Sequence, residues 1–122
     1  MTNLQAIYST WEAFAALKED GTVVAWGNDV HGGDATAVQT DLVGVQTITS
    51  SRRAFAALRT DGTVVTWGDI RFDGNSSAVQ RSLVNVIAIA SNDFAFAAIK
   101  SDGTVIIWGT DIFGGDSSAV QE

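Results

Sequence analysis

Two apolar runs separated by a short polar turn recur three times along the chain. The first copy begins at Ala13 and reads AFAALKEDGTVVAWG, and the others begin at Ala54 and Ala95, so the spacing is 41 residues both times. Of the 27 positions that start at each of these alanines, 14 are identical in all three copies. A period of this length is typical of either a pair of packed helices or a four-stranded propeller blade.

The residues of each copy favour strands over helices. Asp-Gly lies between the two apolar runs every time, and this dipeptide accommodates the positive φ angles of a type I′ hairpin turn. The runs TVVAW, TVVTW and TVIIW are β-branched and aromatic, which suits strands. Longer windows with a period of about 3.6, which helical pairs need, are missing. The pattern therefore predicts an all-β protein built from propeller blades.

The middle copy predicts a four-stranded antiparallel blade. We expect its strands at about 45–49, 54–59, 63–67 and 77–80. The second and third of these are apolar on both faces, as expected of sheets packed between two neighbours. The tryptophan of Trp-Gly is present in every copy, and we expect it to fill the gap between blades, at Trp26, Trp67 and Trp108.

The repeated segments also resemble those of a known family. The segments AALKEDGTVVAWG, AALRTDGTVVTWG and AAIKSDGTVIIWG resemble the repeat of the regulator-of-chromosome-condensation propellers. They are closest to the bacterial branch that includes the β-lactamase-inhibiting propellers, and the resemblance covers the whole chain. After Trp-Gly the chain departs from the Gly-Gln-Leu-Gly type segment of the eukaryotic repeats. The resemblance implies a propeller used as a protein-binding platform, and we carry over neither nucleotide-exchange activity nor histone binding.

The number of repeats bears on assembly. We expect one three-bladed unit with repeats at 1–41, 42–82 and 83–122. Three blades cannot close a ring, because propellers have about four to eight. The chain is three periods minus one residue, so a second copy placed head to tail continues the pattern almost without a gap. We therefore predict a ring closed by oligomerisation, with six blades as a homodimer, and a trimer with nine blades is the alternative.

Variation among the repeats marks a candidate surface for a protein partner. The loops between the first and second strands and between the third and fourth strands should emerge on one face of an antiparallel blade. These loops differ between copies, whereas the Asp-Gly-Thr turn is constant. Exposed aromatic and arginine side chains are common binding anchors. We predict a partner-binding face that contains Trp11, Glu12, Arg52, Arg53, Arg71, Asp93 and Phe94. Drift at solvent-exposed loop tips is the alternative.

Charge and composition exclude several classes of function. A net charge of −7 argues against general affinity for nucleic acid or for an anionic membrane surface. The chain has no cysteine, so neither disulfides nor thiolate zinc sites are available. The single histidine, His31, has no repeated polar cluster around it, and no serine or aspartate lies in a nucleophile elbow or a phosphate loop. We therefore expect no enzyme.

The glycine-rich loops contain pairs of aspartates that could bind a metal ion. Asp29 and Asp34 lie near each other on such a loop, as do Asp111 and Asp116, and their oxygens could hold calcium. The middle copy spoils the spacing, and aspartate and glycine are ordinary turn formers, so we expect neither metal nor cofactor. The leading interpretation is a non-catalytic module that assembles with itself and serves as a protein-binding scaffold. Two alternatives stay open: a ring that binds a small ligand or sugar, or acts catalytically, in its central channel, and a purely structural, fragmentary or designed propeller.

Overall fold

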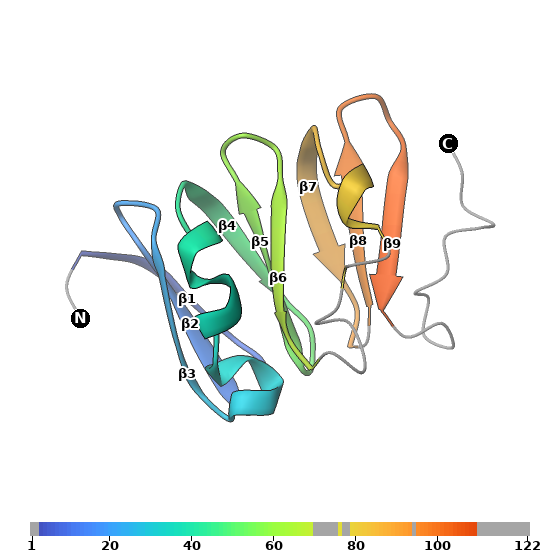
Figure 1. Ribbon diagram of the computed structural model, residues 1–122. Coiled ribbons are helices and arrows are strands. Elements are labelled where there is room, and N and C mark those ends of the chain that lie inside the picture. The colour runs from blue at the N-terminus through green and yellow to red at the C-terminus, as the bar shows by residue number, and fades with distance from the viewer. Residues whose placement is uncertain (1–2, 70–75, 77–78, 94, 110–122) are drawn as a thin grey trace.

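The computed structural model shows three antiparallel sheets that follow one another along the chain (Figure 1). It describes residues 3–69, 76, 79–93 and 95–109. We call the sheets, with their loops, the first, second and third blades. Their strands are β1 (Leu4–Ser9), β2 (Ala13–Lys18), β3 (Val23–Gly27), β4 (Val45–Ser50), β5 (Ala54–Arg59), β6 (Val64–Gly68), β7 (Val86–Ser91), β8 (Ala95–Lys100) and β9 (Val105–Gly109). The prediction of an all-β chain is confirmed, and the first three strands of the middle copy lie within one residue of the expected bounds.

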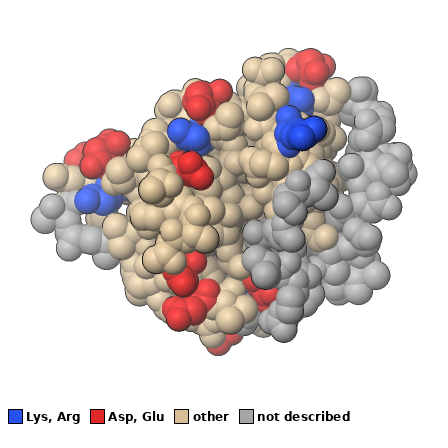
Figure 2. Space-filling model, viewed as in Figure 1, with Lys and Arg blue, Asp and Glu red and all other residues tan. Residues whose placement is uncertain are grey.

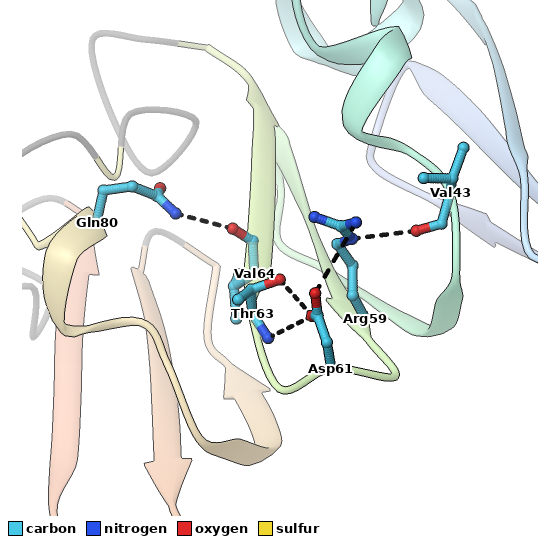
Figure 3. A network of polar contacts seen from close by, with 6 residues as sticks. All are labelled: Val43, Arg59, Asp61, Thr63, Val64 and Gln80. Carbon is cyan, nitrogen blue, oxygen red and sulfur yellow. Dashed lines mark hydrogen bonds and ion pairs between the residues drawn. The ribbon is translucent and has the colours of Figure 1, made fainter.

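In the first blade, a short helix lies where the fourth strand was expected. Thr36–Asp41 forms a 3-10 helix, η2, and Gln80–Ser82 forms η3 in the second blade, where 77–78 lie outside the described residues. The side-chain amide of Gln80 donates a 3.0 Å hydrogen bond to the carbonyl of Val64 (Figure 3). The glutamine side chain thus satisfies a backbone carbonyl of the outer strand that a fourth strand was expected to pair with. The described sheets have three strands each, so our prediction of a fourth strand is corrected for the first blade, whereas in the other two blades it falls partly or wholly outside the described residues.

The hairpin between the second and third strands also differs in detail from the prediction. The N–H of Lys18 donates to the carbonyl of Thr22, and the N–H of Gly21 donates to the carbonyl of Lys18, both at 2.9 Å. Gly21 has φ +84°, and Asp20 is not among the positive-φ residues. This pattern is a three-residue hairpin loop whose last residue is a left-handed glycine. It is not the predicted type I′ turn, because that turn needs two residues with positive φ.

The rest of the Asp-Gly-Thr motif is explained by side-chain bonds. The Asp20 carboxylate accepts hydrogen bonds from the N–H and the hydroxyl of Thr22, at 3.0 and 2.6 Å. Asp61 and Thr63 repeat this arrangement (Figure 3), as do Asp102 and Thr104. In Figure 2, acidic and basic side chains lie toward this hairpin-turn end of each blade. The constant motif therefore serves the local turn.

The core lies between the blades. The face of the second blade that meets the first carries Phe55, Ala57, Val65 and Trp67. Its opposite face, which meets the third blade, carries Ala54, Ala56, Leu58 and Val64. We call the first kind the preceding face and the second kind the following face, and use the same names for the equivalent positions of the other blades. All eight of these side chains are buried, as expected of a sheet packed between two neighbours.

Phenylalanine and tryptophan form the same stack in each blade. The ring centroids of Phe55 and Trp67 are 5.2 Å apart, and those of Phe96 and Trp108 are 5.4 Å apart. Trp67 and Trp108 fill the gaps between blades, as predicted, and both are buried. Trp26 is only partly buried, because no described blade precedes the first one.

Candidate functional site

The loops between the first and second strands of the blades join to form one belt. We call residues 10–12, 51–53 and 92–93 the tip loops. The N–H of Trp11 donates to the carbonyl of Arg52, and the N–H of Arg52 donates to the carbonyl of Asp93, each at 3.0 Å. At the tip loops, one backbone bond therefore joins each blade to the next. The structure brings together these three predicted site residues, one from each blade.

An arginine covers the exposed indole of the first tip loop. The guanidinium carbon of Arg52 lies 3.5 Å from the ring centroid of Trp11, a cation–π contact between neighbouring blades. The Trp11 residue is 67% exposed. Such a contact is worth about 0.5–1 kcal/mol at an exposed site. The pair places an aromatic ring and a guanidinium side by side at the tip belt.

Buried hydroxyl groups give the first two tip loops their shape. The hydroxyl of Thr10 accepts hydrogen bonds from the N–H of Ala13 at 3.0 Å and from the N–H of Glu12 at 3.4 Å. In the second blade, Ser51 accepts a bond from the N–H of Arg53 at 3.4 Å. Such hydroxyl-centred turns satisfy backbone donors within a short loop. The loop therefore turns back into the second strand within a few residues.

The other variable loop begins beside the tip loops, as predicted. The N–H of Asn28 donates to the carbonyl of Glu12 at 2.8 Å, and the N–H of Asp69 donates to the carbonyl of Arg53 at 3.0 Å. Glu12 is exposed, and Arg53 is half-buried. The remaining two predicted site residues, Arg71 and Phe94, lie outside the described residues.

In the glycine-rich loop of the first blade, the Asp34 carboxylate is hydrogen-bonded within the loop. Asp34 accepts hydrogen bonds from the hydroxyl of Thr36 at 2.6 Å and from its N–H at 3.0 Å. These bonds, the hydroxyl first, hold the pKa of Asp34 below its ordinary value. Asp29 begins the single-turn helix η1 (Asp29–Gly33), which also contains His31, whose side chain lies outside the described part.

Other possible sites are sparse in the described chain. No group of three or more histidine, cysteine, aspartate or glutamate side chains comes together among the residues that the structure describes. Asp111 and Asp116 lie outside them. Within the same ranges there is no helix with the length and apolarity needed to cross a bilayer.

A second candidate site consists of the two end faces of the blade stack, whose existence follows from the repeat count but whose residues the sequence analysis did not name. Phe14 on the preceding face of the first blade is 45% exposed, whereas Phe55 at the same repeat position is 0% exposed. The following face of the third blade carries a pocket of about 270 Å³ on its three strands. The repeat hides these features, because the exposed residues are the same types as the buried ones.

Neither a protein-family model nor a curated protein matches the sequence. Several solved structures are similar in fold. Human WBSCR16 matches with a TM-score of 0.65 and 18% identity over 87% of this chain and 33% of its own. Prp20p from Saccharomyces cerevisiae, solved in work on its binding to Gsp1p and histones, matches with a TM-score of 0.63 and 21% identity over 94% of this chain and 33% of its own.

A plant receptor extends the range of similar structures. The ectodomain of the receptor kinase CR4 from Physcomitrella patens matches with a TM-score of 0.59 and 19% identity over 87% of this chain and 29% of its own. The chain thus spans about a third of the length of the structures it resembles. At these identities the likeness concerns the fold. Its described sheets have the fold of RCC1-like propeller blades.

Proposed function

We propose that the chain is a non-catalytic propeller module that assembles with itself, head to tail, into a closed ring. Two copies give a homodimer of six blades, within the usual range for propellers. The observation that carries this proposal is that each end face repeats a face that is buried inside the chain. The closer kinship with the bacterial β-lactamase-inhibiting propellers stays a prediction from the sequence.

The exposure of equivalent residues supports this proposal. On the preceding faces, Val24 of the first blade is 39% exposed, and Val65 of the second is 8% exposed. On the following faces, Ile99 of the third blade is 40% exposed, and Leu58 of the second is 3% exposed. Contiguous apolar surface of this kind is a common mark of an interaction site. A second copy would cover both end faces with the contacts that the chain already makes internally.

The hairpin turns support the same direction of assembly. The N–H of Val45 donates to the carbonyl of Gly21, and the N–H of Val86 donates to that of Gly62, each at 2.9 Å. The turn of each blade therefore meets the start of the next one. A Cβ on Gly62 would lie 3.2 Å from the backbone of the following blade, whereas one on Gly103 would meet nothing within 4 Å. The space beside the turn of the third blade is thus open, where a following blade would pack.

The first blade presents the matching backbone. Asn3 has φ +60°, close to the +64° of Gly44 and the +58° of Asn85, its equivalents in the other blades. Those two residues lie against the preceding turns, at Gly21 and Gly62. Asn3 therefore already has the left-handed conformation needed to meet a turn like that of Gly103.

Native mass spectrometry tests the ring. We expect a species of twice the chain mass of 12.8 kDa. A trimer would keep the ring and change the number of blades to nine. A stable monomer at micromolar concentration would overturn the proposal.

We also propose that the assembled ring serves as a protein-binding scaffold through its tip loops. The Trp11–Arg52 pair carries this part, because aromatic and arginine side chains dominate binding hot spots. Protein partners are also known for a protein of the same fold, since yeast RCC1 (Prp20) has been solved bound to Kap60.

Affinity capture with matched variants tests whether the tip loops bind a protein partner. A partner should bind the wild type and the V43A control about 10-fold or more tighter than it binds W11A or R52A. Val43 is a suitable control because it is exposed and lies away from the tip loops. Partners that bind all four proteins equally would show that the tip loops are the wrong surface.

A further inference from the structure

We infer that Phe14 of one copy is the anchor of the join between copies, and that it enters the pocket on the following face of the third blade of the second copy. This inference rests on the proposed self-assembly and names the side chain and the site that recognise each other.

The pocket is shaped by small residues. It has a volume of about 270 Å³ and is lined by residues of all three strands of the third blade, among them Ala95, Ala97 and Ile107. The two alanines belong to the AFAAL segment that every blade carries. Their short side chains leave room above the sheet for a large side chain from outside.

The same place is filled at both boundaries inside the chain. In the second blade, the equivalents of these alanines are Ala54 and Ala56, and they share a buried cluster with Phe96 of the third blade. The equivalents in the first blade are Ala13 and Ala15.

At that first boundary the pattern is the same. Ala13 and Ala15 share a buried cluster with Phe55 of the second blade, which is fully buried, and Phe96 is 1% exposed at the other boundary. Each following face thus receives the phenylalanine of the next blade. Only the following face of the third blade receives none from the described chain.

Phe14 is the corresponding phenylalanine of the first blade, and no following face covers it among the residues that the structure describes. It stacks on Trp26 with a centroid distance of 5.6 Å and an interplanar angle of 21°, as Phe55 stacks on Trp67 at 5.2 Å and 28°. The ring is therefore already held as it is in the buried blades, so little side-chain freedom is lost on binding. A second copy of the chain supplies both the missing phenylalanine and the missing pocket.

Two variants test the join from its two sides. F14A removes the anchor, and A97F fills the pocket. We expect each to raise the dissociation constant of the assembly by about 100-fold or more, as truncation or obstruction of a central anchor does. Ala97 is only half-buried on an open face, so A97F leaves the core of the single chain in place.

The control is V43A, which removes a similar apolar side chain from another exposed place. Val43 lies at the boundary between the first two blades and is still 44% exposed. It is therefore not part of a face that a neighbouring blade covers. We expect sedimentation of V43A to match that of the wild type.

Mixing the two variants gives the most specific result. In a head-to-tail dimer of one F14A copy with one A97F copy, one join has Phe14 and an open pocket. The other join pairs the truncated position 14 with the filled pocket. We expect the mixture to assemble although neither variant does alone, which also shows that both variants are folded.

The outcomes separate this inference from the proposal on which it rests. A wild type that sediments as a monomer would overturn the self-assembly itself. A wild type that assembles while F14A and A97F assemble equally well would leave the ring intact and overturn the role of Phe14. Failure of the mixture to assemble would also contradict the pairing of anchor and pocket.

Discussion

The first and second blades have nearly the same repeat sequence but differ in the number of blades that pack against them. AFAAL begins both β2 and β5. In the second blade its phenylalanine lies between two sheets, and in the first blade the equivalent phenylalanine faces outward. The strands, hairpin and aromatic stack are the same in both. Local structure is thus set by the repeat itself, whereas burial is set by the neighbour.

The largest expected difference is between F55A and F14A. F55A should lower the free energy of unfolding by about 3–5 kcal/mol, because it leaves a cavity in a packed core. F14A should cost less than about 1 kcal/mol at a dilution where copies have separated, because its ring is already half in water. Urea denaturation of dilute protein measures both. Equal costs would mean that the first blade is covered by something other than a second copy.

The glycines of the hairpin turns give a second, smaller contrast. Gly62 and Gly103 have φ +84° and +90°, so an alanine is strained at either position, by about 1–2 kcal/mol. G62A should cost more than G103A, because its Cβ would press on the backbone of Asn85 at 3.2 Å. Denaturation of the separated copies should show this difference. In the assembled ring we expect the two costs to converge, and a difference that persists there would argue against head-to-tail contact.

The outer edge of the blades should not depend on neighbours. Gln39 and Gln80 each donate a 3.0 Å bond to the carbonyl of an outer strand, in the first and second blades. Q39A should lower the free energy of unfolding by about 1 kcal/mol, and Q80A by more, because the Oε1 of Gln80 also accepts a 2.8 Å hydrogen bond from the hydroxyl of Ser76. Thermal unfolding measures this, with Q46A as the control at an exposed position of β4. A cost of Q39A larger than that of Q80A would show that a further contact holds the outer edge of the first blade.

The smallest expected effect is the pH dependence of the hairpin turns. Hydrogen bonds from Thr63, its hydroxyl first, lower the pKa of Asp61 below its ordinary value of 3.8, and those from Thr22 lower the pKa of Asp20 in the same way. The pKa of Asp102 is lowered by Thr104, by its backbone N–H first and then by its hydroxyl. The unfolded chain then binds protons more readily than the folded one. These carboxylates stabilise the fold above about pH 4, and their contribution is lost as the pH falls through the folded pKa.

The variants D20N, D61N and D102N check this point. Each should reduce the loss of stability on acidification by a similar amount, since the turn is the same in every blade. Urea denaturation in acidic buffers, compared with neutral pH, gives the slope. A variant with the same slope as the wild type would show that its turn does not lower the carboxylate pKa.

Much of the fold could be predicted because its determinants are local. The β-branched runs and the Asp-Gly-Thr turn lie within a few residues of their partners, so the three hairpins follow from the sequence. The fourth strand was mispredicted in the first blade because ATAVQ has the β-branched and small residues of an edge strand. Its glutamine, however, can bond an outer-strand carbonyl with its side chain, and this depends on where Gln39 lies in space.

The candidate site was less accessible to the sequence. That Trp11 and Arg52 lie in equivalent loops follows from the repeat, but their stacking depends on the rotation between two blades. The role of Phe14 could not be predicted from the sequence, because Phe14 and the buried Phe55 lie in the same AFAAL segment. Only the number of repeats hinted at open ends.

The backbone belt of the tip loops has a polarity with consequences for symmetry. Each N–H points to the carbonyl of the next blade, from Trp11 to Arg52 and from Arg52 to Asp93. An interface that continues this order joins two different surfaces and is therefore heterologous. If the rotation per blade closes the circle, every tip loop lies on one side, and a dimer offers each side chain twice, which favours bivalent partners. If the rotation fails to close, the same contacts propagate as an open filament, so the pitch of the blades decides between a ring and a fibre.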